Sequence, residues 1–228
     1  MATVEEIQAP TLDRRLFAEL LGTAFLLAIV VGSGIMGERL ANGNDAIALL
    51  GNTVATGVGL MVLILIFGPV SGAHFNPAVT LSFAIQRALS WSDAGLYVVA
   101  QVLGAFVGVA VAHLMFGEAV YLPSETLRTG GGQWLGEFVA TFGLIATIIG
   151  CLKTRPEAVP YAVGLFITAG YWFTSSTSFA NPAVTLGRTM TDTFSGIYPA
   201  HAPAFILAQL AGAVVVTLVF AWLYREPA

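Results

Sequence analysis

Charged residues are scarce in this sequence, and cysteine is almost absent. Of the 228 residues, 10% are charged and 57% are hydrophobic, and the mean hydropathy is +0.82. These values lie far outside the range of a soluble globular domain. The nine basic residues are scattered, so no basic patch favours binding to nucleic acid. The single cysteine, Cys151, excludes an internal disulfide, and we expect a packed thiol near a helix end.

The sequence also lacks the patterns that mark common enzymes. It contains no cluster of metal-ligating residues, no nucleophile paired with a base and no phosphate-binding loop. We therefore expect no enzyme activity, no cofactor and no bound metal.

Long apolar runs dominate the chain instead. A helix needs roughly 20 mostly apolar residues to cross the hydrocarbon core of a bilayer. Six segments qualify, at about Leu16 to Met36, Ala46 to Phe67, Ala94 to Phe116, Trp134 to Leu152, Val159 to Phe173 and Pro203 to Leu223. The first is not expected to be a cleaved signal peptide, because Glu5 and Glu6 precede it and Glu19 lies inside it. The sequence predicts an all-α membrane protein with six transmembrane helices.

Basic residues outside these spans predict the orientation of the chain in the membrane. One side receives Arg14, Arg15, Arg87, Lys153, Arg155 and Arg225. The other side receives Arg39, Arg128 and Arg188. Because positive charge favours the cytoplasmic side, we expect a multi-pass protein of the cell (plasma or inner) membrane with both termini in the cytoplasm.

An internal repeat organises the chain. The segment "SGAHFNPAVT" at 71–80 shares Asn-Pro-Ala-Val-Thr with "SFANPAVT" at 178–185. "AELLGTAFLL" matches "GEFVATFGLI", which puts Glu19 and Glu137 in corresponding positions, and "AQVLGA" matches "AQLAGA". The repeats run from about 16 to 116 and from about 134 to 223. Each has three spans, an odd number, so the second repeat is inverted, and we expect one domain over residues 1–228.

Each repeat contains a further apolar segment that is too short to cross the membrane. These segments are about Gly72 to Arg87 and about Ser178 to Met190. Irregular backbone at membrane depth is tolerated only where protein buries it or where it lines a water-filled cavity. The two segments are therefore predicted to be re-entrant short helices.

The Asn-Pro pairs predict where these short helices begin. Asparagine is among the best N-cap residues, and proline suits the first helical position. By inverted symmetry, the helices that follow Asn76 and Asn181 meet near the midplane, with their positive dipole ends facing a pore. These ends oppose cations, while the two amides can donate to a neutral solute. A single Asn-Pro pair would mark only a turn, but two extended copies in corresponding places favour the pore.

The paired Asn-Pro-Ala boxes resemble the aquaporin family, the major intrinsic proteins, and the likeness covers about Leu16 to Leu223. The resemblance implies six transmembrane helices plus two re-entrant half-helices, in a homotetramer with one pore per subunit. Membrane lipid, water and small neutral solutes are the expected partners. The pore motifs it implies are Asn76, Pro77 and Ala78 in the first repeat and Asn181, Pro182 and Ala183 in the second.

Three ionisable residues are assigned supporting roles by this resemblance. It implies that Glu19 and Glu137 brace the re-entrant loops, and a proton relay is the alternative for a carboxyl group inside a membrane. His74 precedes the first box and is expected to support its loop or to line the cytoplasmic vestibule.

The sequence departs from the family pattern at the outer constriction. Water-selective relatives carry an aromatic residue, a histidine and an arginine there, whereas the corresponding offsets give Thr56, Ala169, Ser178 and Val184. These small side chains predict a wide selectivity filter that admits glycerol, urea and undissociated arsenous acid. The continuation "NPAVTLGRTMTDTFSGI" resembles bacterial aquaglyceroporins linked with arsenic resistance. Arg188, one turn beyond Val184, can reach back toward the lumen, but we expect it to snorkel outward or tie the loop.

Two other functions remain open from the sequence. A channel mainly for water would have the same fold. A secondary transporter would also use inverted repeats and broken helices, but no carboxylate lies near the boxes in the sequence to bind a coupling ion.

Overall fold

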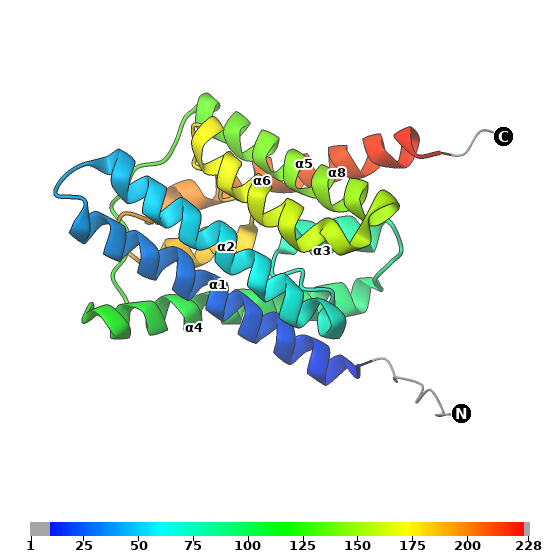
Figure 1. Cartoon of the computed structure of the whole chain (residues 1–228), viewed down its shortest axis with the longest axis horizontal. Coiled ribbons are helices and arrows are strands. Elements are labelled where there is room, and N and C mark those ends of the chain that lie inside the picture. The colour runs from blue at the N-terminus through cyan, green and yellow to red at the C-terminus, as the bar shows by residue number, and fades with distance from the viewer. Residues whose placement is uncertain (1–9, 226–228) are drawn as a thin grey trace.

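The computed structural model describes residues 10–225, and every regular element in this range is a helix (Figure 1). The elements are α1 (Leu12–Leu40), α2 (Asp45–Ser71), α3 (Pro77–Ile85), α4 (Trp91–Phe116), α5 (Gly131–Thr154), η1 (Pro156–Ala158), α6 (Val159–Phe173), α7 (Pro182–Arg188), η2 (Pro199–His201) and α8 (Ala202–Leu223). The expectation for Glu5 and Glu6, and for the two chain ends, lies outside the described residues.

Six of these helices match the six predicted spans. Five of them, α1, α2, α4, α5 and α8, are long and apolar enough to cross a membrane. The sixth, α6, has 15 residues and is about 22 Å long at 1.5 Å per residue. It follows directly on the 3₁₀ turn η1 and packs between α2 and α5. The predicted fold, with six transmembrane helices and two short ones, is confirmed.

The helices pack closely where glycine removes the side chain. In the first half, α1 packs against α2 and α4, and in the second half α5 packs against α6 and α8. Gly104 and Gly108 of α4 face the carbonyl oxygens of Leu20 and Ala24 on α1, and a Cβ atom at either glycine would collide with them. The GxxxG spacing therefore sets the distance between α1 and α4.

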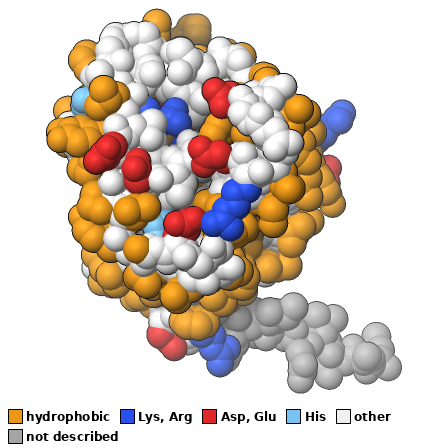
Figure 2. All heavy atoms as spheres, turned by 90° about the vertical axis from the view of Figure 1, so that its left-hand side faces the viewer, with side chains coloured by type: hydrophobic (Ala, Val, Ile, Leu, Met, Phe, Trp, Pro, Cys, Tyr) orange, Lys and Arg blue, Asp and Glu red, His pale blue; other side chains and the backbone are white. Residues whose placement is uncertain are grey.

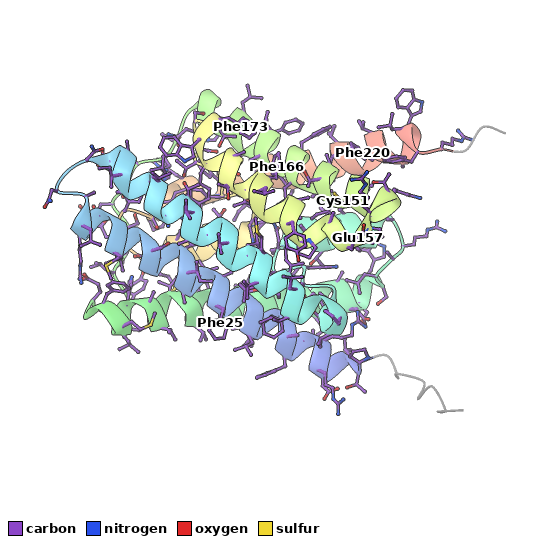
Figure 3. The ribbon with its side chains drawn as sticks, in the orientation of Figure 1. Phe25, Cys151, Glu157, Phe166, Phe173 and Phe220 are labelled. Atoms are coloured by element: carbon purple, nitrogen blue, oxygen red, sulfur yellow. The ribbon has the colours of Figure 1, made fainter. Side chains whose placement is uncertain are left out.

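The outside of the bundle is apolar. Large hydrophobic side chains are exposed along α1, α2, α4, α5, α6 and α8. Phe25 of α1 is 52% exposed and points away from the bundle, as Figure 3 shows. Such a surface suits lipid or a neighbouring subunit, and the chain is a membrane protein.

Polar side chains gather at the two ends of the bundle. The start of α1 and the end of α8 lie at one end (Figure 1), where Arg15 pairs with Asp93 at 3.3 Å. The turn between α1 and α2 lies at the other end, where Arg39 pairs with Glu118 at 2.7 Å. Figure 2 views this second end and shows acidic and basic side chains around a hollow.

Candidate functional site

The two short helices begin at the asparagines of the repeated motif. The side chain of Asn76 accepts a hydrogen bond from the Ala78 N–H at 2.8 Å, and that of Asn181 accepts from the Ala183 N–H at 2.9 Å. Pro77 occupies the first position of α3, as Pro182 does in α7. Both side chains are thereby fixed by the helices that they cap.

The same two asparagines also join the halves of the molecule. Asn76 Nδ2 donates to the Ala180 carbonyl at 2.7 Å, and Asn181 Nδ2 donates to the Phe75 carbonyl at 2.8 Å. An amide group has two N–H donors, so one donor on each asparagine is left for a molecule in the cavity that both residues line. The Asn-Pro-Ala boxes thus meet inside the bundle.

The backbone before each asparagine is strained. Ala73 and Phe75 have φ of 50° and 49°, and the corresponding Ser178 and Ala180 have φ of 52° and 48°. Non-glycine residues in this left-handed region cost about 1–3 kcal/mol each. The surrounding structure must therefore hold both loops in place.

Glu19 holds the first loop. Its carboxylate accepts from the backbone N–H groups of His74 at 2.9 Å and Phe75 at 2.7 Å. It also accepts from Ser71 Oγ at 2.6 Å and Gln101 Nε2 at 2.8 Å. The side chain is fully buried, and every contact is a donor to the carboxylate.

Glu137 holds the second loop in the same way. Its carboxylate accepts from the backbone N–H groups of Phe179 at 2.9 Å and Ala180 at 2.8 Å, and from Gln209 Nε2 at 2.6 Å. Gln209 also donates to Thr185 Oγ1 of α7 at 2.8 Å, which ties the loop to its short helix and to α8. The contacts of both glutamates are those of a brace.

His74 lines the cavity from the first loop. Its Nδ1 is 3.1 Å from Thr80 Oγ1, and its ring packs against Phe83 and Tyr97 with centroids 4.5 and 5.4 Å away. Because Thr80 Oγ1 accepts from Gln101 Nε2 at 2.9 Å, its hydroxyl proton is free to bond Nδ1. This tautomer leaves Nε2–H as a donor, and the ring supports the loop while it faces the lumen.

A cavity of about 80 Å³ runs past both asparagines. Its walls combine apolar side chains with a small number of polar groups. The polar lining consists of Thr56, His74, Asn76, Tyr171, Ser178, Asn181 and Arg188. Among residues 10–225, no three His, Cys, Asp or Glu side chains come together in a way that could hold a metal ion.

Three of the four residues that were predicted to form the outer constriction line the cavity. Thr56, Ser178 and Val184 line the cavity, but Ala169 is exposed on the other side of α6, and its prediction as a filter residue is wrong. Tyr171 faces the cavity instead, with its hydroxyl 3.4 Å from Thr56 Oγ1. Two residues correspond to about 200° of rotation on a helix, so a fixed offset counted across the loop selects the wrong face.

The sequence held a signal for Tyr171 that the offset overlooked. Four residues of α6 line the cavity, and they recur at intervals of four: Val159, Val163, Ile167 and Tyr171. This spacing is typical of one helix face. The end of the cavity therefore carries an aromatic side chain, although none was predicted at the four filter positions.

Arg188 turns inward. It is 2% exposed, it lines the cavity, and its Cζ atom is 3.4 Å from the centre of the Phe179 ring. The expectation that it snorkels outward is wrong, because its Nε donates to the Ser195 carbonyl of the following loop, which folds over the helix end. The expected bond between Arg188 and the loop is therefore present, and it directs the guanidinium toward the cavity.

Comparisons with known proteins agree with this architecture. Residues 6–159 match the family model described as "Major intrinsic protein". The chain is 56% identical to "Aquaglyceroporin AqpS" of Rhizobium meliloti (strain 1021), over 94% of this chain and 91% of that protein. It is 33% identical to "Aquaporin NIP1-1" of Oryza sativa subsp. japonica, over 93% of this chain and 73% of that protein.

A solved structure shares the fold. The aquaglyceroporin from Plasmodium falciparum superposes with a TM-score of 0.75 at 20% sequence identity, covering 92% of this chain and 96% of that one. At this identity the likeness concerns the fold alone.

Proposed function

Because the chain belongs to the major intrinsic protein family, whose members are passive channels and not enzymes, we propose that its pore conducts glycerol, urea and undissociated metalloid acids such as arsenous acid, together with water. The high identity to a protein named as an aquaglyceroporin supports solutes larger than water. A water-selective channel is the alternative. The small residues predicted for the filter argue against it, whereas the large side chains of Tyr171 and Arg188 in the cavity lining favour it.

The observation that carries this proposal is the mixed lining of the cavity. Apolar side chains such as Leu60, Ile148 and Val163 form most of the wall, and the amides of Asn76 and Asn181 interrupt it with fixed donors. A polyol has apolar carbon on one side and hydroxyl groups on the other. Such a wall can replace its hydration in steps while it offers little to a bare cation.

We propose the following roles for individual residues. We assign the pore motifs to residues 76–78 and 181–183, with Glu19, Glu137 and His74 as supports of the loops. The outer constriction is assigned to Thr56, Ser178 and Val184, with Tyr171 in place of Ala169. We further propose one channel domain over the whole chain, a homotetramer in the cell membrane, and cytoplasmic termini.

Purified protein in liposomes tests the proposed function. Stopped-flow light scattering measures the permeability to water, glycerol, urea and arsenous acid against protein-free liposomes. We expect a faster flux for each, linear in solute concentration and independent of ion gradients. Water flux without glycerol flux would establish the water-selective alternative, and saturable, ion-coupled flux would establish a transporter.

A further inference from the structure

The cavity holds a buried arginine without a carboxylate partner. Nη1 of Arg188 is buried and has no hydrogen-bond partner among residues 10–225. Nε donates to the Ser195 carbonyl, and the face of the guanidinium lies on the Phe179 ring. A guanidinium has five N–H donors in one plane. Its edge is therefore left for a molecule at this end of the cavity, which we call the Arg188 end and which Thr56, Tyr171, Ser178, Phe179 and Arg188 line.

A second arginine adds positive charge at the same place. Arg128 Cζ is 5.3 Å from the centre of the Phe179 ring, so both guanidinium groups contact this ring. The Arg128 guanidinium donates to carbonyl oxygens, with Nε 2.8 Å from Gly196 O and Nη2 3.4 Å from Phe194 O. Within residues 10–225, the ion pairs involve Arg15 and Arg39, whereas Arg128 and Arg188 take part in none.

The nearby carboxylates are already engaged. Glu137 accepts from two backbone N–H groups and from a glutamine. Glu118 pairs with Arg39, Glu38 accepts from the Phe194 N–H at 3.2 Å, and Asp192 accepts from the Glu125 N–H at 2.9 Å. Each of these carboxylates keeps its negative charge, but within residues 10–225 none of them is hydrogen-bonded to Arg188 or Arg128.

A buried charge is costly unless it is paired and hydrogen-bonded. The edge of a guanidinium matches two oxygen atoms held in one plane, as in a carboxylate or nitrate ion. The Arg188 end of the cavity lies among the side chains of Thr56, Tyr171 and Phe179, so a small anion suits it better than a bulky one. A neutral solute can accept the same hydrogen bonds, but it leaves the charge uncompensated.

We propose that the Arg188 end of the cavity binds a small, planar, singly charged oxyanion, which competes with water and neutral solutes for the pore. The proposal rests on the proposed channel function, because a bound anion lies in the path of the solute. It assigns a ligand site to a residue one turn beyond Val184 on α7. Tyr171 and Thr56 contribute hydroxyl groups to the lining of this site.

Nitrate is a suitable probe because it is planar and stays ionised at any working pH. Proteoliposomes are prepared with potassium nitrate or potassium gluconate at equal concentration on both sides, and water and glycerol permeability are measured by light scattering. We expect nitrate to lower both permeabilities at least twofold in a saturable manner. Gluconate is much bulkier than nitrate and is not planar, and it serves as the ionic-strength control.

Three variants locate the effect. Arg188→Met keeps the length of the side chain without the charge and should abolish the nitrate effect. Arg188→Lys keeps the charge but loses the planar pair of N–H donors, so nitrate binding should weaken by roughly tenfold, the loss of about one hydrogen bond to a charged group. Arg39→Met removes an exposed arginine from the same end of the bundle and should leave nitrate sensitivity unchanged.

Each result decides the matter. Equal permeability of the unmodified channel in nitrate and gluconate would overturn the proposal, because water alone then satisfies the guanidinium. Nitrate sensitivity that persists in Arg188→Met would place the anion elsewhere and overturn the proposal too.

If Arg188→Met does not fold, as judged by size-exclusion chromatography, the comparison of Arg188→Lys with the unmodified channel decides. Nitrate-sensitive water flux without any glycerol flux would reject the proposed solute and retain the anion site.

Discussion

Replacing Glu137 with alanine tests whether the buried carboxylate is a brace. The change removes the acceptor of the Phe179 and Ala180 N–H groups, which lie 2.9 and 2.8 Å from the carboxylate oxygens. A buried donor without a partner costs about 1–3 kcal/mol. Two such donors give a loss of roughly 2–6 kcal/mol in the free energy of unfolding. Gln209 keeps its bond to Thr185, so we do not count its lost contact.

The loss should appear in function as well as in stability. Without its brace, the loop has no compensation for the strained φ angles of Ser178 and Ala180. Thermal unfolding in detergent and water permeability in liposomes measure the two effects, and both should fall. Glu118→Ala is the matched control, because Glu118 is a partly exposed carboxylate whose pair with Arg39 is worth at most about 1 kcal/mol.

A proton relay predicts a different pattern. In a relay, Glu137→Gln would change only the pH dependence of flux, since glutamine keeps the shape of the side chain. A brace loses one acceptor oxygen in the same variant, so stability should fall at every pH. The brace is refuted if Glu137→Ala unfolds at the same temperature as Glu118→Ala and conducts water equally well.

Three further changes test the packing and the constriction. Gly108→Ala should destabilise the protein, because its Cβ would collide with the Ala24 carbonyl, whereas Gly95→Ala on the same helix meets no atom within 4 Å and should be neutral or stabilising in thermal unfolding. Tyr171→Ala should raise the ratio of glycerol to water permeability, and an unchanged ratio would remove Tyr171 from the constriction. Val184→Arg should lower glycerol and arsenous acid permeability more than water permeability, because it adds a large side chain to the lumen one turn from Arg188, and unaffected solute uptake would show that the constriction is assigned wrongly.

Local sequence was sufficient for the architecture. The apolar runs predicted six spans, and each corresponds to a helix, though α1 begins at Leu12 rather than Leu16. Hydropathy detects the apolar part of a helix and misses polar turns such as the one that contains Arg14 and Arg15. Asn-Pro fixes the starts of α3 and α7, because capping and proline geometry act over neighbouring residues only.

Local sequence could not predict which face of α6 meets the cavity or which way the Arg188 side chain points. Ala169 and Tyr171 lie on opposite faces of one helix, and which face meets the lumen depends on its packing against α2 and α5. Arg188 is turned inward by a carbonyl seven residues away in a loop without regular structure. Sequence periodicity gives the faces of a helix, but only the tertiary fold says which face a neighbour covers.

The two halves depend on each other at their closest point. Asn76 and Asn181 each donate to the carbonyl that immediately precedes the other asparagine, so neither loop can shift without breaking a bond to the opposite loop. Glu19 holds the N–H groups on one side of this exchange and Glu137 holds those on the other. The buried carboxylate of each half thus fixes the residue whose carbonyl accepts the asparagine amide of the opposite half. Each re-entrant loop therefore supplies the acceptor that the asparagine of the other loop uses, which one loop alone would lack.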